Sequence, residues 1–233
     1  MQKLLIILSL CFLFSCGDNA SDKLIVKGNI KGLKKGTVYL KKASDSTFIT
    51  VDSMVVNGSS NFQLQSPIES PELFYLYLDK NDTKENIITF FGDKGTTEIN
   101  TSRKRFSYDA KINGSKQQEV FEAYLDMASK FNNKNLELIK ENFDAIKEND
   151  TALINATEKN YKNLEKRKYL YTVNFSITNR DSEVAPYLAL TELYNANIKL
   201  LDMVNDTLTT SVKASNYGKE LQRFIDKIKK GEE

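Results

Sequence analysis

The sequence predicts an α+β protein, in which an N-terminal antiparallel β-sandwich or barrel-like domain at residues 23–113 precedes an α-helical domain at residues 114–233 with a long helical hairpin. Two observations predict this order. Before Gly114, apolar and polar residues alternate with the period of two that half-buried strands show, and after Gly114 the apolar residues recur at helical spacing. No low-complexity linker or internal repeat separates the two parts.

Short apolar segments bounded by turn residues predict seven or eight strands in the first part, as in a sandwich or a related barrel. The segments are Lys23–Lys27, Thr37–Lys41, Phe48–Val56, Phe62–Leu64, Phe74–Leu78, Ile87–Phe91, Thr96–Ile99 and Phe106–Ile112. Asn57-Gly58 stands between two of them, and because both residues tolerate a positive φ it is the strongest local hairpin signal.

The second part predicts two long helices that pack as an antiparallel hairpin, followed by shorter helices. Ser115 with Gln118 has the form of a capping box at the start of the first helix, and Ser182 and Ser215 are the expected starts of later helices. The apolar stripe of the first helix is Val120, Phe121, Tyr124, Leu125, Ala128 and Phe131, continued by Leu136, Ile139, Phe143 and Ile146. The second helix carries Ile154, Thr157, Tyr161, Leu164, Lys168, Tyr171 and Phe175 after a break at residues 148–151.

The N-terminus has the layout of a secretory signal, since Lys3 precedes an apolar run from Leu4 to Phe14. The run is shorter than the roughly 20 apolar residues that a membrane-spanning helix needs. It ends in Leu13-Phe14-Ser15-Cys16-Gly17, which resembles a bacterial lipobox. We therefore predict a signal peptide at residues 1–15, a lipid on Cys16 and a polar tether at residues 16–22. The alternatives are an ordinary signal peptide with an incidental cysteine and a buried apolar element.

Cysteine and histidine counts restrict the chemistry that the chain can perform. Cys11 would leave with the signal peptide and Cys16 would carry the lipid, so the mature chain would have no free thiol for a disulfide or a nucleophile. The chain has no histidine, which argues against zinc sites and Ser-His-Asp catalysis, and we expect no cofactor. With 33 basic and 31 acidic residues, no nucleic-acid partner is implied.

Several segments resemble the lipoprotein module called domain of unknown function 4369, which in Bacteroidetes is typically fused ahead of thioredoxin-like thiol-disulfide oxidoreductases. The similar pieces are Val26-Lys27-Gly28 through Gly36-Thr37-Val38-Tyr39-Leu40, Val51-Asp52-Ser53 through Asn57-Gly58 to Phe62, Asn113-Gly114-Ser115, Ser182–Tyr187 and Ser215–Leu221. Proteins of this kind usually continue into a domain with active-site cysteines, whereas the sequence given ends at Gly231-Glu232-Glu233. The resemblance therefore implies an accessory or orphaned module, and no redox residue is carried over.

Three groups of residues are candidate binding or turn sites. Tyr39, Tyr75 and Tyr77 would suit a sugar or peptide groove, although aromatic residues in strands also form cores and cross-strand pairs. The basic run Arg103, Lys104 and Arg105 would hold an anion or lipid headgroups, or form a solvated loop. Gly28, Gly32 and Gly36 recur every four residues, and turn glycines explain them better than a phosphate cradle.

Three triplets resemble the O-glycosylation acceptor of Bacteroidetes envelope proteins, although Asp-Ser and Asp-Thr also form caps and turns. They are Asp52-Ser53-Met54, Asp150-Thr151-Ala152 and Asp206-Thr207-Leu208.

Three functional hypotheses follow. We favour a non-catalytic cell-envelope lipoprotein, held at the outer membrane by the lipid on Cys16, that binds a protein or ligand through its sandwich and hairpin. The first alternative is an accessory subunit of a split redox system whose envelope partner is a thioredoxin-like protein. The second is a hydrolase with paired carboxylates, although Glu137 and Glu141 have the spacing of a solvated helix face. The sequence leaves the oligomeric state open.

Overall fold

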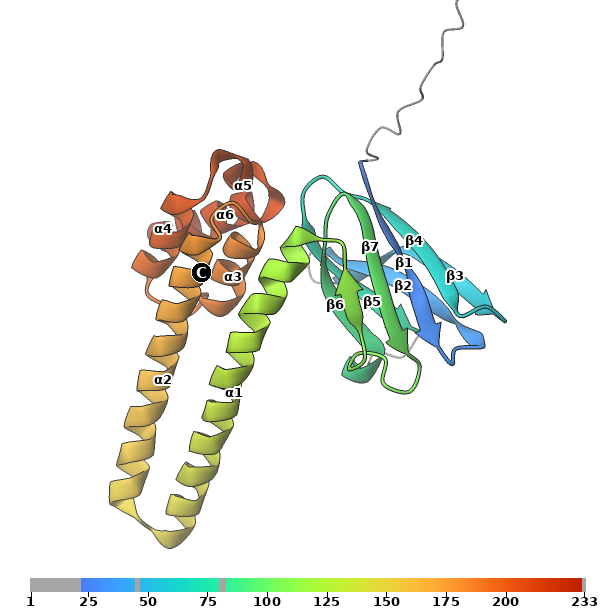
Figure 1. Cartoon of the computed structure of the whole chain (residues 1–233). Coiled ribbons are helices and arrows are strands. Elements are labelled where there is room, and N and C mark those ends of the chain that lie inside the picture. Colours follow the sequence, from blue (N-terminus) through green and yellow to red (C-terminus); the bar gives the residue numbers. More distant parts are fainter. Residues whose placement is uncertain (1–21, 45–46, 80–82, 232–233) are drawn as a thin grey trace, which may run out of the picture.

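The computed structural model describes residues 22–44, 47–79 and 83–231, and it shows a sandwich-like pair of sheets followed by a helical domain (Figure 1). This confirms the predicted fold class. The predicted signal peptide, Cys16 and the tether up to residue 21 lie outside the described residues.

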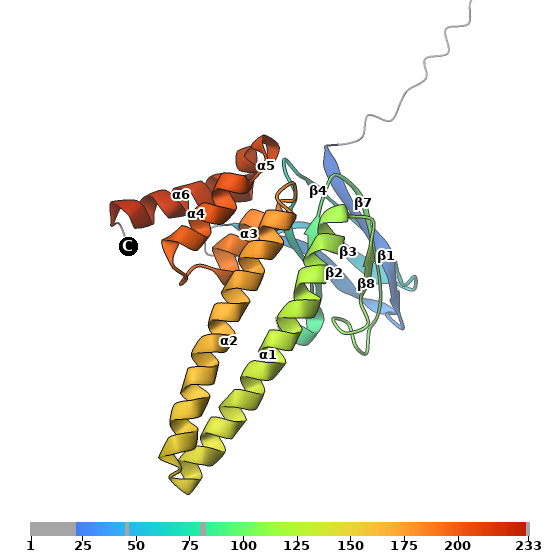
Figure 2. The same ribbon diagram turned by 60° about the vertical axis from the view of Figure 1, so that its left-hand side comes forward.

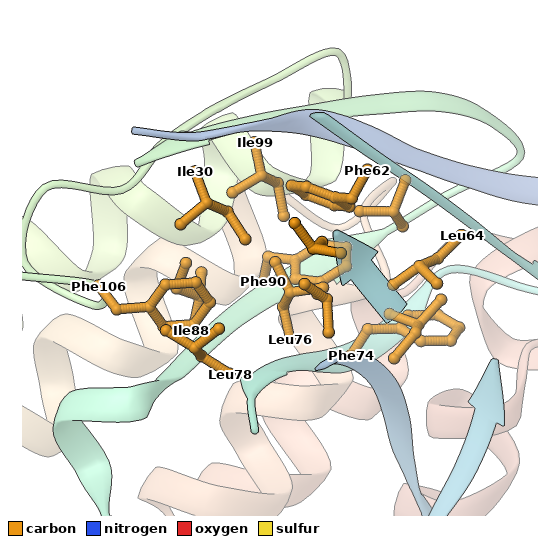
Figure 3. Packing of buried hydrophobic residues seen from close by; sticks show 14 of the residues in the cluster. Ile30, Phe62, Leu64, Phe74, Leu76, Leu78, Ile88, Phe90, Ile99 and Phe106 are labelled. Carbon is orange, nitrogen blue, oxygen red and sulfur yellow. The ribbon is translucent and has the colours of Figure 1, made fainter. Parts of the chain in front are cut away.

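The strands form two four-stranded sheets, one with the order β4-β1-β7-β8 and the other with the order β3-β2-β5-β6. Their bounds are β1 Lys23–Lys31, β2 Lys35–Ser44, β3 Thr47–Asn57, β4 Asn61–Pro67, β5 Glu72–Leu78, β6 Ile87–Gly92, β7 Gly95–Ser102 and β8 Lys111–Asn113, with a short 3₁₀ turn at Lys84–Asn86. Ile30, Phe62 and Ile99 of the first sheet face Leu76 and Phe90 of the second, and these side chains are almost completely buried (Figure 3). The alternating pattern therefore builds one core between the sheets.

The predicted hairpin at Asn57-Gly58 is wrong. Gly58 does adopt a positive φ of 92°, but β3 pairs with β2 in one sheet and β4 pairs with β1 in the other. β1 and β2 form one arm of a longer hairpin, and β3 and β4 form the other, and both arms pass from one sheet to the other at this point. Two main-chain bonds join the arms there: Ile30 N donates to Ser60 O at 2.9 Å, and Gly58 N donates to Lys34 O at 2.8 Å. The turn residues were identified correctly, but what they connect depends on distant strands.

Two further strand predictions differ from the structure. β1 and β7 run parallel, with Gly28 opposite Ile99, because the chain between them crosses through the other sheet. The predicted strand Phe106–Ile112 shrinks to β8 at Lys111–Asn113, and the residues before it form turns. Phe106 belongs to a turn, but its side chain is buried in the core between the sheets. Thr101 Oγ1 donates to the carbonyl oxygen of Phe106 at 2.7 Å.

Six helices follow, with the bounds α1 Lys116–Glu148, α2 Thr151–Thr178, α3 Val184–Glu192, α4 Ile198–Thr207, α5 Thr210–Ala214 and α6 Asn216–Lys230. Ser115 Oγ accepts from Gln118 N at 3.3 Å and Ser215 Oγ accepts from Gly218 N at 3.2 Å, so the caps at these two positions are confirmed. Ser182 lies one residue further out than predicted, because Glu183 is the residue that precedes α3, although Ser182 Oγ still accepts from Val184 N at 3.2 Å. The sequence did not predict α4 or α5, although the start of α4 is marked by Asn197 Oδ1, which accepts from Lys199 N at 3.0 Å.

The α1–α2 hairpin extends away from the rest of the molecule in both views (Figures 1 and 2). Asn149 ends α1 with a φ of 55°, and Asp150 begins α2 by accepting from Leu153 N at 3.0 Å. Near the sandwich, Phe121 and Tyr124 of the predicted stripe are buried. In the outer half the prediction is wrong, because Leu136, Ile139, Phe143 and Ile146 are exposed. Leu138 and Ala145 are buried there instead.

Candidate binding surface

The outer face of the β3-β2-β5-β6 sheet is divided between a covered end and an open end. Its inner side chains, such as Leu76 and Phe90, enter the sandwich core. On the outer side, Leu73 and Phe91 are buried in a cluster with the helices, whereas Tyr75 is only partly buried. The helices thus cover one end of the face and leave the other accessible.

The covered end is a junction of aromatic rings. The ring of Phe91 lies 5.8 Å from that of Phe121, 5.7 Å from Tyr187 and 5.9 Å from Tyr217. Tyr217 Oη accepts from Leu73 N at 3.2 Å. Burial of the two side chains raises the pKa of Tyr217 and raises the pKa of Tyr187 to about 12.

Gln118 ties α1 to the edge of the sheet. Its Oε1 accepts from Phe91 N at 2.7 Å, and its side chain is 3% exposed. Since β6 is an edge strand, this bond satisfies a main-chain donor that would otherwise lie unpaired at the sheet edge. The residue that we predicted to close a capping box therefore joins the two halves of the molecule.

The open end forms a hollow of about 710 Å³. It is lined by Lys41, Phe48, Tyr75, Tyr77, Lys84, Ile87 and Thr89, a set that we call the aromatic shelf. The rings of Phe48 and Tyr75 meet edge to face at 4.7 Å, and Lys41 Nζ lies 3.8 Å from the centre of the Tyr77 ring. Phe48 is 51% exposed, so it offers a large apolar surface to a partner.

A β-bulge places Phe48 on the shelf. Leu40 pairs with Asp52 while Lys41 pairs with Thr50, so Val51 is the extra residue of β3. Because side chains alternate along a strand, the extra residue places the side chains on its two sides in opposite alternation. Phe48, which lies before Val51, therefore reaches the outer face of the sheet, where it contacts Tyr75.

Two of the three predicted groove tyrosines line the hollow. Tyr75 and Tyr77 do so, whereas Tyr39 is the half-buried cross-strand neighbour of Tyr77 and is not among the lining residues. The prediction missed Phe48, Lys41 and Lys84. Alternation on β2 would have placed Lys41 beside Tyr39, but the bulge that brings in Phe48 leaves no signal in the sequence.

The other predicted residues lie apart from the shelf. Arg103, Lys104 and Arg105 form an exposed turn after β7, where Arg105 Nε lies 3.4 Å from Asp109 Oδ1. Gly28 lies within β1, where a Cβ atom would come 1.7 Å from Ile99 O. Close approach of two strands explains this glycine, so the predicted turn role is wrong for Gly28, whereas Gly32 does adopt a positive φ of 84°.

The acidic candidates are dispersed. Glu137 lies on the exposed side of α1, 2.7 Å from Lys134 Nζ. A separate hollow of about 480 Å³ between the sandwich and the helices includes Glu72 and Glu220 among its lining residues, and Glu72 lies 3.1 Å from Lys42 Nζ. Within the described ranges, no three His, Cys, Asp or Glu residues gather in a way that could hold a metal ion.

Residues of all three Asp-Ser and Asp-Thr triplets take part in local structure. Asp52 Oδ2 accepts from Gln65 N at 2.8 Å, and Asp150 caps α2. In the third triplet, Thr207 Oγ1 donates to Val204 O at 2.8 Å. Ser53 and Thr151 are exposed, and glycosylation at these positions stays a prediction.

Burial also raises the pKa of Glu183, which accepts from Gln117 Nε2 at 2.7 Å beside the start of α3. Ser182 donates to the carbonyl oxygen of the same glutamine side chain and accepts from Val184 N at 3.2 Å. The polar groups here tie α1 to α3 and serve the packing of the helical domain.

Residues 24–121 match the model of a protein family described as Domain of unknown function (DUF4369). The matched segment contains the eight strands that the structure describes, except Lys23 at the start of β1, and it ends at Phe121 in α1, so it includes both Gln118 and the aromatic shelf. No curated protein matches the chain significantly. In the part of the chain that the structure describes, none of the helices has the length and hydrophobicity to cross a membrane.

Proposed function

We propose that this chain, which carries a DUF4369 domain at residues 24–121, is a non-catalytic lipoprotein of the cell envelope that binds an extended segment of a protein partner on its aromatic shelf. The exposed ring of Phe48 beside Tyr75 is the observation that carries this proposal. Monomeric proteins seldom expose large aromatic side chains together unless they serve an interaction.

The chemistry of the shelf favours apolar side chains in the partner. Phe48, Tyr75 and Ile87 supply aromatic and aliphatic surface, and rigid aromatic residues lose little conformational entropy on binding. A segment with alternating apolar residues would direct every second side chain into the hollow.

The membrane attachment is the second part of the proposal and rests on the sequence. Lys3, the run Leu4 to Phe14 and Cys16 together have the layout of a bacterial lipoprotein signal. We expect Cys16→Ala to remove the protein from the envelope fraction, with the outer membrane as the expected destination. An intact mass equal to the unmodified full chain would contradict this part alone.

Site-specific photo-crosslinking tests the shelf. A photoreactive phenylalanine analogue at Phe48 should form an adduct with another envelope protein in intact cells. The same analogue at Tyr108, which is 69% exposed but is not part of the shelf, serves as the matched control.

An adduct that requires Phe48 supports the proposal, and its identification by mass spectrometry names the partner. Equal adducts from both positions, or none from Phe48, would show that the shelf is not an interface. Recovery of a thioredoxin-like protein would favour the accessory redox role that the family resemblance suggests.

A further inference from the structure

The outer half of α1 carries an apolar stripe that its own hairpin does not cover. Leu136, Ile139, Phe143 and Ile146 are 63%, 53%, 57% and 52% exposed. They are separated by three, four and three residues, which is the heptad spacing of a coiled-coil seam.

A second seam on α1 already serves the contact with α2. Tyr124 Oη lies 2.8 Å from Thr172 Oγ1, and Asn142 Oδ1 accepts from Thr157 Oγ1 at 2.8 Å. Leu138 and Ala145 are buried along the same line. The exposed stripe lies one position further along the sequence, so it is turned by about 100° from the contact with α2.

The small buried area between α1 and α2 explains why a partner would stabilise the outer half of the hairpin. In residues 132–165, the outer half of the hairpin, the fully buried residues are Leu138, Ala145 and Thr157, and Thr157 Oγ1 donates to Asn142 Oδ1. Long helices depend on tertiary packing of an apolar face for most of their stability. Here the largest apolar side chains are on the side that faces water.

The apolar surface continues onto α2. A hollow of about 240 Å³ lies between the two helices and is lined by Ile139 and by Tyr161, which is 47% exposed. The stripe and this tyrosine therefore form one face of the hairpin, which we call the hairpin face: Leu136, Ile139, Phe143, Ile146 and Tyr161.

We propose that the hairpin face is a homodimer interface, in which the stripe on α1 of one copy packs against the same stripe of a second copy. If a second copy covers these five residues completely, roughly 500–600 Å² per copy leaves water, or about 1,000–1,200 Å² in total, which reaches the lower end of the range for specific interfaces. The stripe contains no charged residue, so it does not repel its own copy across a two-fold axis.

Charge argues against a membrane surface as the occupant. Between residues 136 and 148, the helix has four acidic residues, Glu137, Glu141, Asp144 and Glu148, and two lysines, Lys140 and Lys147. Helices that lie on anionic lipid surfaces carry mostly basic residues on their polar face, whereas the flank of the stripe on α1 is mainly acidic. The facing part of α2, residues 151–168, has five basic and two acidic residues, so it is complementary in charge to the flank of α1 in a second copy. The alternating charges are instead typical of a solvated flank beside a protein–protein seam.

The mass of the full chain in a mild detergent tests the proposal. Light scattering with correction for bound detergent should give the mass of two chains at micromolar concentration. The double variant Ile139→Glu/Phe143→Glu places carboxylates in the seam and should weaken self-association at least about 100-fold.

Val55→Glu is the matched control, because Val55 is 72% exposed on β3 and the change is of the same kind. It should leave the dimer intact. Circular dichroism shows whether each variant keeps its helical content, so a loss of the dimer is not mistaken for unfolding.

A single-chain mass for the unaltered protein at about 100 µM would overturn the proposal, as would a dimer that persists in the double variant. A single-chain mass combined with a photo-adduct from position 143 to a different protein would assign the hairpin face to a hetero-partner and would equally overturn it. None of these outcomes tests the proposed role of the aromatic shelf, because the shelf lies on the sandwich and not on the hairpin.

Discussion

Replacing Gln118 with leucine removes the group that joins α1 to the edge of the sandwich. In the native protein, Gln118 Oε1 accepts from Phe91 N at 2.7 Å in a buried setting. Leucine fills a similar volume but accepts no hydrogen bond, so the amide of Phe91 would be left without this partner.

The expected cost follows from the burial of that donor. A buried N–H group without an acceptor costs about 1–3 kcal/mol. The extra apolar surface of leucine returns up to about 1 kcal/mol. We therefore expect Gln118→Leu to lower the free energy of unfolding by about 1–2 kcal/mol, and the Tm by roughly 2–8 °C for a chain of this length.

Urea denaturation and hydrogen exchange check this prediction. Glu122→Leu is the control, because Glu122 accepts from Gln118 Nε2 at 2.8 Å but does not contact Phe91 N. It should cost less, since Glu122 is exposed. Unfolding free energies within about 0.5 kcal/mol of each other, together with unchanged protection of the Phe91 amide, would refute the reasoning.

Two other predictions concern packing and pH. Gly28→Ala should lower the free energy of unfolding by more than about 3 kcal/mol, because its Cβ would lie 1.7 Å from Ile99 O; a Tm within about 2 °C of the native value would contradict this. Burial raises the pKa of Tyr187 to about 12 from its ordinary value of 10.0, so the neutral phenol is favoured in the folded state. The stability that the neutral phenol of Tyr187 gives the folded state is fully present below pH 10 and is lost as the pH rises through about 12. Urea unfolding at pH 9 and pH 11 should therefore show a steeper loss of stability for the native protein than for Tyr187→Phe, and equal losses would contradict the assignment.

Features that depend on a few neighbouring residues could be predicted from the sequence. Ser115 and Ser215 cap helices through bonds to main-chain groups three residues away, and the break between α1 and α2 falls at residues 149–150. Gly58 was identified as a turn residue because few other residues tolerate its φ. These interactions are local, so the order of residues determines them.

The candidate site could be predicted only in part. Alternation on β5 placed Tyr75 and Tyr77 on one face. Phe48 could not be assigned to that face, because the bulge at Val51 depends on how β3 meets β2. Gln118 was interpreted as a capping residue, and only the docking of α1 against β6 showed that it bonds to Phe91.

The sequence by itself determined the change from strands to helices near Gly114, the places where helices begin and the heptad spacing along α1. The tertiary structure decided which strands pair, which outer side chains the helices cover, and that Leu136 to Ile146 face water. The physical reason is that spacing defines the faces of a helix or strand, whereas burial of a face requires a partner surface from elsewhere in the chain.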